Sequence, residues 1–69
     1  MIDFNDIQVG DTIVVHTSWG TGELVTGTVR GKEKLGKNEQ DVVDYYVDGN
    51  KFENWCYIYQ VKKLIKEKE

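Results

Sequence analysis

The chain has 69 residues, which predicts one domain over residues 1–69 with a single thin hydrophobic core. One cysteine excludes an intrachain disulfide, and one cysteine with one histidine cannot build a zinc site, so we expect neither metal nor cofactor. Twelve acidic residues against nine Lys and Arg give a net charge of −3, which argues against general attraction to nucleic acid.

The N-terminal part of the chain predicts a lead-in followed by a strand. Phe4 and Ile7 lie three residues apart, as in one helical turn, within a lead-in over residues 1–8. The β-branched run Thr12–Ser18 predicts a strand. No apolar run approaches the ~20 residues that span a bilayer. The first residues also lack the basic start and apolar centre of a signal peptide, so we expect a soluble cytoplasmic protein with no membrane segment.

A second strand is predicted over Glu23–Gly31, and the isolated Gly27 within it indicates a bulge or a sharp bend. Lys32–Gln40 is polar and contains Gly36, which predicts an exposed connection. The alternative is that the strand continues a few residues into this segment.

The clearest structural signal is a hairpin with its turn at Gly49–Asn50, because both residue types tolerate positive φ. Its two strands are predicted over Asp41–Val47 and Lys51–Ile58. Alternation along them predicts an outward set and an inward set. The outward set is Val42, Asp44, Tyr46, Glu53, Trp55 and Tyr57, and the inward set is Val43, Tyr45, Val47, Phe52 and Cys56.

The C-terminal part predicts a tight helical corner and a last strand. Ile58–Gln60 is the predicted corner and Val61–Ile65 the closing strand, although the apolar spacing of the latter also fits a helix. Residues 66–69 are predicted to be a frayed tail.

This order of parts resembles the SH3-like small β-barrel, an all-β fold of five strands with a short helical turn before the last. The resemblance covers residues 7–65. Gly27–Val29 and the turn Val9–Asp11 are similar to KOW barrels of ribosomal and transcription factors, and Trp55–Leu64 is similar to the final strand, corner and closing strand of SH3 domains. The Ala-Leu-Tyr-Asp-Tyr opening of SH3 domains is absent and no proline follows Ile58, which argues against polyproline recognition. The size, the lysine and asparagine usage and the absence of proline resemble small phage or prophage proteins.

The apparent catalytic and metal motifs lack the residues that their chemistry needs. The segment from Gly22 to Thr28 has neither the lysine nor the following helix of a phosphate loop. The segment from Asp44 to Gly49 lacks the further carboxylates of a calcium loop. Cys56 is expected to be a packed cysteine and not a nucleophile served by His16, so we do not expect an enzyme.

Exposed aromatic residues form the candidate binding site, and we expect them to bind a protein partner. Aromatic side chains give a large contact area with few rotors to order, and the resemblance implies that Trp19, Trp55 and Tyr59 lie together. The alternative is that one or both tryptophans cap the thin core. Nearby acidic residues favour a basic partner. The aromatic set is Trp19, Tyr46, Trp55, Tyr57 and Tyr59, and the acids are Glu23, Asp44 and Glu53.

Nucleic-acid binding is the alternative function. In a nucleic-acid barrel, the basic residues between positions 30 and 37 would meet phosphates while Trp19, Trp55 or Tyr57 stacked on bases. Four acids between Glu39 and Asp48 would repel a nucleic-acid backbone there, so we prefer a protein partner. The candidate nucleic-acid contacts are Arg30, Lys32, Lys34 and Lys37.

Overall fold

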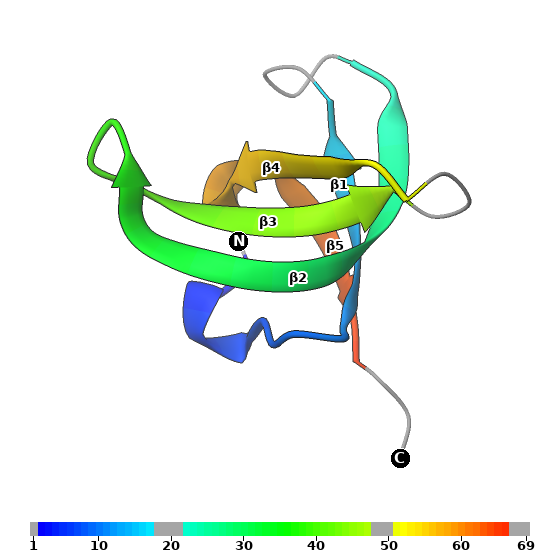
Figure 1. Cartoon of the computed structure of the whole chain (residues 1–69), viewed down its shortest axis with the longest axis horizontal. Helices are drawn as coiled ribbons and strands as arrows, with labels where there is room; N and C mark the ends of the chain where they lie inside the picture. Colours follow the sequence, from blue (N-terminus) through cyan, green and yellow to red (C-terminus); the bar gives the residue numbers. More distant parts are fainter. Residues whose placement is uncertain (1, 18–21, 48–50, 67–69) are drawn as a thin grey trace.

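The computed structural model describes residues 2–17, 22–47 and 51–66, which form strands joined by turns and short helices. In chain order the elements are η1 (Phe4–Asp6), β1 (Thr12–His16), β2 (Leu24–Lys37), β3 (Gln40–Val47), β4 (Glu53–Tyr57), η2 (Ile58–Gln60) and β5 (Val61–Ile65). The strands make one antiparallel sheet in the order β4-β3-β2-β1-β5 (Figure 1). β4 and β5 are its two edges, so strand pairing does not close the sheet into a barrel. Within the described ranges, no helix has the length and apolar character needed to cross a membrane.

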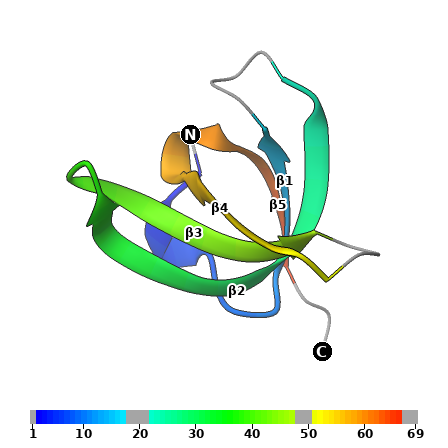
Figure 2. The same cartoon turned by 45° about the horizontal axis from the view of Figure 1, so that its top comes forward.

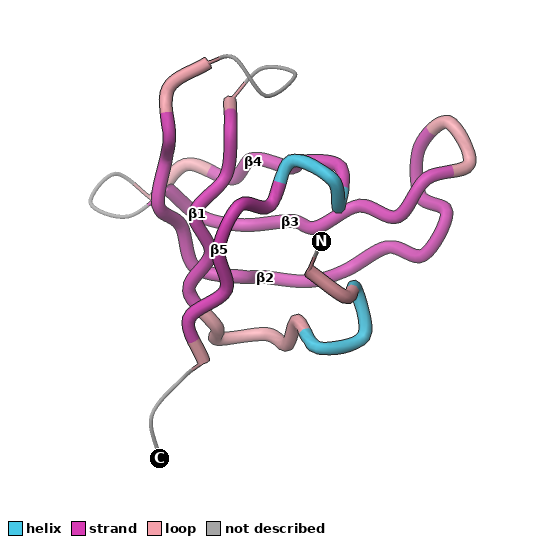
Figure 3. The backbone as a smooth tube through the Cα atoms, turned by 180° about the vertical axis from the view of Figure 1, so that it is seen from behind, coloured by secondary structure: helices cyan, strands magenta, loops and turns pink. Residues whose placement is uncertain are grey.

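The predicted all-β class, the five strands and the helical corner before the last strand are confirmed. η1 supplies the helical turn expected near Phe4, and Figure 3 shows η1 before the first strand and η2 between β4 and β5. Val61–Ile65 pairs with β1, which decides between strand and helix in favour of strand. The hairpin turn at Gly49–Asn50 lies outside the described residues, but β3 and β4 pair antiparallel on either side of it.

β2 is the long strand that both halves of the sheet share. It pairs with β1 from Leu24 to Thr28 and with β3 from Gly27 to Lys37, and it bends between these two pairings (Figure 2). The predicted strand end at Gly31 is therefore wrong, whereas the alternative, in which the strand continues into Lys32–Gln40, is confirmed, and the segment is exposed as expected. The turn contains only Asn38 and Glu39, whose φ angles of 50° and 58° suit a two-residue hairpin loop.

Of the two predictions for Gly27, a bulge or a sharp bend, the bulge is wrong, because the register shift lies at Arg30. β2 does bend where its pairings with β1 and β3 overlap, at Gly27 and Thr28. Pairing runs without a break through Gly27, whereas the register with β3 shifts between Val29 and Gly31. Gly27 is required for a different reason: a Cβ there would lie 2.5 Å from Cδ2 of Tyr45 and 2.6 Å from the carbonyl oxygen of Tyr46. The absence of a side chain lets β3 approach β2 closely.

The core contains Ile7, Ile13, Val15, Val29, Val43, Tyr45, Cys56 and Val61. The predicted inward residues Val43, Tyr45 and Cys56 are buried there, and Val47 packs against them. Phe52 is a correction, because it is 70% exposed. It precedes β4, and burial along that strand begins only at Cys56, so Phe52 lies beyond the part of the hairpin that covers the core.

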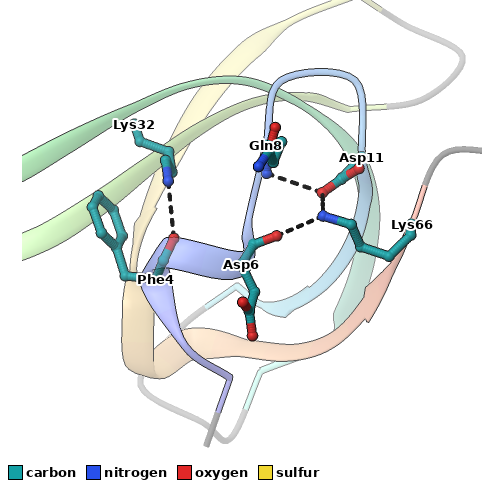
Figure 4. A network of polar contacts seen from close by, with 6 residues as sticks. All are labelled: Phe4, Asp6, Gln8, Asp11, Lys32 and Lys66. Carbon is teal, nitrogen blue, oxygen red and sulfur yellow. Dashed lines mark hydrogen bonds and ion pairs between the residues drawn. The ribbon is translucent and has the colours of Figure 1, made fainter.

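Polar contacts hold the lead-in and the end of β5 together (Figure 4). The Asp11 carboxylate is 3% exposed and accepts hydrogen bonds from the Gln8 N–H at 2.9 Å and from Lys66 Nζ at 2.6 Å. Lys66 Nζ also donates to the carbonyl oxygen of Asp6 at 2.6 Å. The predicted frayed tail therefore does not include Lys66, and residues 67–69 lie outside the described residues.

Candidate functional site

The outer face of β3 and β4 carries most of the predicted binding residues. Residues directly opposite each other in a sheet share a face, and the register pairs Val42 with Tyr57, Asp44 with Trp55, and Tyr46 with Glu53. Strand alternation turns this set away from the core residues Val43, Tyr45 and Cys56. The predicted grouping of Tyr46, Trp55 and Tyr57 on one face is therefore what the structure shows.

Three aromatic rings make a continuous row on this face, which we call the aromatic ladder: Trp55, Tyr57 and Tyr59. Trp55 meets Tyr57 edge to face, with centroids 5.2 Å apart and an interplanar angle of 86°. Tyr57 stacks on Tyr59 of η2 with centroids 5.4 Å apart and an angle of 10°. Both geometries are favourable for aromatic pairs, so the rings fix one another in place.

The ladder has an exposed part and a buried part. Trp55 is 41% exposed and Tyr59 38%, whereas Tyr57 is only 7% exposed. The expectation that Tyr57 and Val42 are available at the surface is therefore corrected, since Val42 is fully buried opposite Tyr57. Tyr57 lies between its two aromatic neighbours, and Asn38 Nδ2 donates to its hydroxyl at 2.6 Å. Tyr57 therefore packs against the exposed rings of Trp55 and Tyr59 and holds them in position.

The β2–β3 hairpin places a cation on the ladder. Because β2 continues to Lys37, Lys37 Nζ lies 4.8 Å from the centroid of the Trp55 ring. A cation over an indole face is attracted by the negative charge of the ring. Trp55 is thus held by Tyr57 and by Lys37 while much of its surface stays in solvent.

The other end of this face carries Tyr46 and an ion pair. Arg30 Nε lies 3.1 Å from Glu53 Oε1, and the Arg30 guanidinium lies 6.0 Å from the Tyr46 centroid. The hydrogen bond with Tyr46, followed by the charge of Glu53, raises the pKa of Arg30. The bulge at Arg30 places this side chain on the outer face.

A shallow depression of about 200 Å³ joins this ion pair to Trp55, and it is lined by Arg30, Asp44, Glu53, Asn54 and Trp55. Burial, followed by a hydrogen bond and charge repulsion from Glu33, raises the pKa of the Asp44 carboxyl. Asp44 and Glu33 therefore lie close together, and the positive charges of Arg30 and Lys37 offset part of the repulsion between the two carboxyl groups.

The structure does not bring two other predicted contact residues into this site. Trp19 lies outside the described residues. Glu23 does not line the depression, and its carbonyl oxygen accepts hydrogen bonds from the N–H and hydroxyl of Thr17.

The predicted basic residues do not form one patch. Arg30 pairs with Glu53 and Lys37 lies over Trp55, both on the outer face. Lys32 points to the opposite side, where its Nζ donates to the carbonyl oxygen of Phe4 at 3.0 Å and lies 4.6 Å from that ring (Figure 4). Lys34 is exposed near the end of the hairpin.

Asn38, Asn54 and Gln60 contribute to the site and were missed by the sequence analysis. Asn38 reaches Tyr57, Asn54 lines the depression, and Gln60 accepts a hydrogen bond from the Tyr57 N–H at 2.9 Å. A two-residue turn assigned at Asn38–Glu39 would have placed Asn38 beside β4. The other two carry no sequence signal beyond their polar character.

Cys56 has the environment of a packed core residue. Its side chain is buried, and burial, followed by the charge of Asp44, raises the pKa of the thiol to about 12. The thiolate that acts as nucleophile or metal ligand is therefore disfavoured at neutral pH. Across the described ranges, no three His, Cys, Asp or Glu side chains lie where they could together hold a metal ion.

Comparisons of the chain with protein-family models, with curated proteins and with solved structures find no match. Its function is therefore inferred from the geometry of the chain itself.

Proposed function

We propose that this chain is a non-enzymatic binding module that binds a protein partner through Trp55, Tyr59 and Tyr46. The observation that carries this proposal is the state of Trp55: it is 41% exposed although Tyr57 and Lys37 fix its position. A tryptophan held in place before binding loses little conformational freedom when a partner covers it. Such rigid aromatic side chains are frequent energetic hot spots of protein interfaces.

The charges beside the ladder favour a basic partner. Asp44 and Glu53 line the depression next to Trp55, and Glu33 lies beside Asp44. A Lys or Arg of the partner placed there would relieve the repulsion between the carboxyl groups of Asp44 and Glu33.

The distribution of basic residues argues for a protein partner over nucleic acid. A single-stranded nucleic acid needs a continuous basic groove along its backbone together with stacking aromatics. Here Lys32 lies on one side of the sheet, while Arg30 and Lys37 lie on the other and are engaged with Glu53 and Trp55.

The proposal includes an SH3-like small barrel as the fold. The order of five strands, the 3-10 corner η2 between β4 and β5, and the pairing of β5 with β1 support this assignment. The buried, protonated thiol of Cys56 supports a non-enzymatic role, because the most reactive nucleophile type in the chain is inactive at neutral pH.

A capture experiment with two matched variants tests the proposed function. The intact chain, Trp55→Ala and Phe52→Ala are immobilised, and proteins retained from cell extract are quantified by mass spectrometry. Phe52 is the control because it is the more exposed aromatic and is not part of the ladder. The protein retained by both the intact chain and Phe52→Ala should be lost with Trp55→Ala, and equal recovery by all three would contradict the proposal.

A salt titration tests the nucleic-acid alternative. The expected result is no binding to single- or double-stranded DNA or RNA at low salt. Binding that weakens steeply as salt rises would favour nucleic acid instead, because phosphate contacts release counterions.

A further inference from the structure

β4 is an edge of the sheet, and its backbone alternates between facing β3 and facing outward. The Val47 N–H donates to the carbonyl oxygen of Phe52 at 3.0 Å. Antiparallel alternation then directs the backbone groups of Asn54 and Cys56 toward β3 as well. The N–H groups of Glu53, Trp55 and Tyr57 point away from the sheet, where an added strand would normally meet them.

Two side chains of the protein occupy two of these three outward positions, those of Trp55 and Tyr57. The Trp55 N–H donates to Asn54 Oδ1 at 2.8 Å, and the Tyr57 N–H donates to Gln60 Oε1 at 2.9 Å. The Gln60 side chain also contacts β1, because its Nε2 donates to the carbonyl oxygen of His16 at 2.9 Å. Gln60 therefore ties the β4 edge to the end of β1, with which β4 shares no strand pairing.

We infer that Asn54 and Gln60 close β4 to strand addition, so that the partner is recognised through side chains on the outer face. This inference rests on the proposed function for the existence of the partner, but not for the closed edge itself. An extended peptide gains affinity at an open sheet edge from main-chain hydrogen bonds. At β4 the donors of Trp55 and Tyr57 are already used, and pairing there would first have to break the contacts of Asn54 and Gln60.

The partner chemistry follows from the closed edge. A folded protein surface, whose own backbone groups are satisfied, needs no main-chain hydrogen bonds from this protein and is the partner we infer. Its apolar side chains would cover Trp55 and Tyr59, and a basic side chain would meet Asp44, which lines the depression beside Trp55.

Amide hydrogen exchange measured by NMR on the intact chain tests the closed edge without a partner. The Trp55 and Tyr57 amides should be protected although they lie on an edge strand. Asn54→Ala should speed exchange at Trp55 about tenfold, and Gln60→Ala should do the same at Tyr57, the size expected for losing one hydrogen bond. Exchange of both amides at unprotected rates in the unaltered chain would overturn the inference.

Conservative variants separate loss of the hydrogen bonds from loss of the fold. Asn54→Asp keeps an acceptor at the same position, so Trp55 should stay protected. Gln60→Glu keeps the acceptor for the Tyr57 N–H but removes the donor to His16, so Tyr57 should stay protected as well. If these variants lost protection as fully as the alanine variants, acceptance by these side chains would not be its cause.

Sedimentation velocity tests the consequence for association. The double variant Asn54→Ala/Gln60→Ala should form a larger species than the unaltered chain at equal concentration, because its β4 edge is open. A double variant that sediments as the unaltered chain does would overturn the closed-edge inference. Trp55→Ala keeps both side-chain acceptors, so its failure to alter partner capture would contradict the proposed function and leave the closed edge standing.

Discussion

Gly27 shows how one residue permits the sheet to form. Its missing side chain makes room for the Tyr45 ring and for the carbonyl oxygen of Tyr46, both of which would lie within 2.6 Å of an added Cβ. Because Tyr45 is a core residue, the ring cannot move aside without disturbing its neighbours.

Substitution of Gly27 by alanine should therefore destabilise the fold. We expect the free energy of unfolding of Gly27→Ala to fall by about 1–3 kcal/mol, as for other overpacked sites. Gly31→Ala is the matched control, because among the described residues the nearest atom to its added Cβ is Asp44 Oδ2, at an ordinary contact distance of 3.9 Å. Urea unfolding of the two variants checks this, and a loss at Gly31 equal to that at Gly27 would show that strand glycine in general, and not the contact with Tyr45, is responsible.

Asp44 should make the stability depend on pH in a definite direction. Its folded pKa is raised, chiefly by burial, above the unfolded value of about 3.9. Folding therefore favours the protonated Asp44 carboxyl group. The contribution of this group to stability is complete below the unfolded pKa and is lost as pH rises through the folded pKa.

Asp44→Asn stays neutral and escapes this loss. The variant should gain stability relative to the unaltered chain as pH rises from below about 3.9 to neutrality. Urea unfolding at several pH values measures the difference. A stability difference that does not change with pH would contradict a raised Asp44 pKa.

At the scale of elements, the β2–β3 hairpin marks the limit of what the sequence predicts. The β-branched runs and the corner at Ile58–Gln60 were located from local pattern, because each has a strong local preference. Local pattern does not locate the end of β2, because Lys32–Lys37 is polar and exposed and has no apolar alternation to reveal a strand. Cross-strand pairing with β3 holds it extended, and that pairing is a tertiary interaction.

The same limit applies to the candidate site. Alternation predicted correctly that Tyr46, Trp55 and Tyr57 turn away from the core. It did not predict that Tyr57 is buried, because the cover comes from Tyr59 and Asn38 on other elements. Burial on the outer face of so small a sheet depends on which loops fold over it.

At the scale of the whole molecule, the Asp11–Lys66 pair joins the start of β1 to the end of β5. Asp11 is buried, whereas the Lys66 side chain is 54% exposed, so water screens the ammonium group but not the carboxylate. Loss of the ion pair would leave the buried Asp11 carboxylate with fewer partners.

Removing the Lys66 ammonium group should destabilise the whole fold. Lys66→Ala should lower the free energy of unfolding by about 1–2 kcal/mol, less than for a fully buried pair because of solvent screening. Lys63→Ala, at an exposed position of β5, is the control and should change little. Equal effects of the two variants on the urea midpoint would show that the contact with Asp11 contributes nothing.

If a protein partner covers Trp55, the fluorescence of this tryptophan reports it directly. Trp19→Phe leaves Trp55 as the single tryptophan of the chain. Titration with the purified protein from the capture experiment should shift its emission to shorter wavelength, because an indole 41% exposed to water becomes buried. Binding confirmed by sedimentation with no change in Trp55 emission would contradict the account.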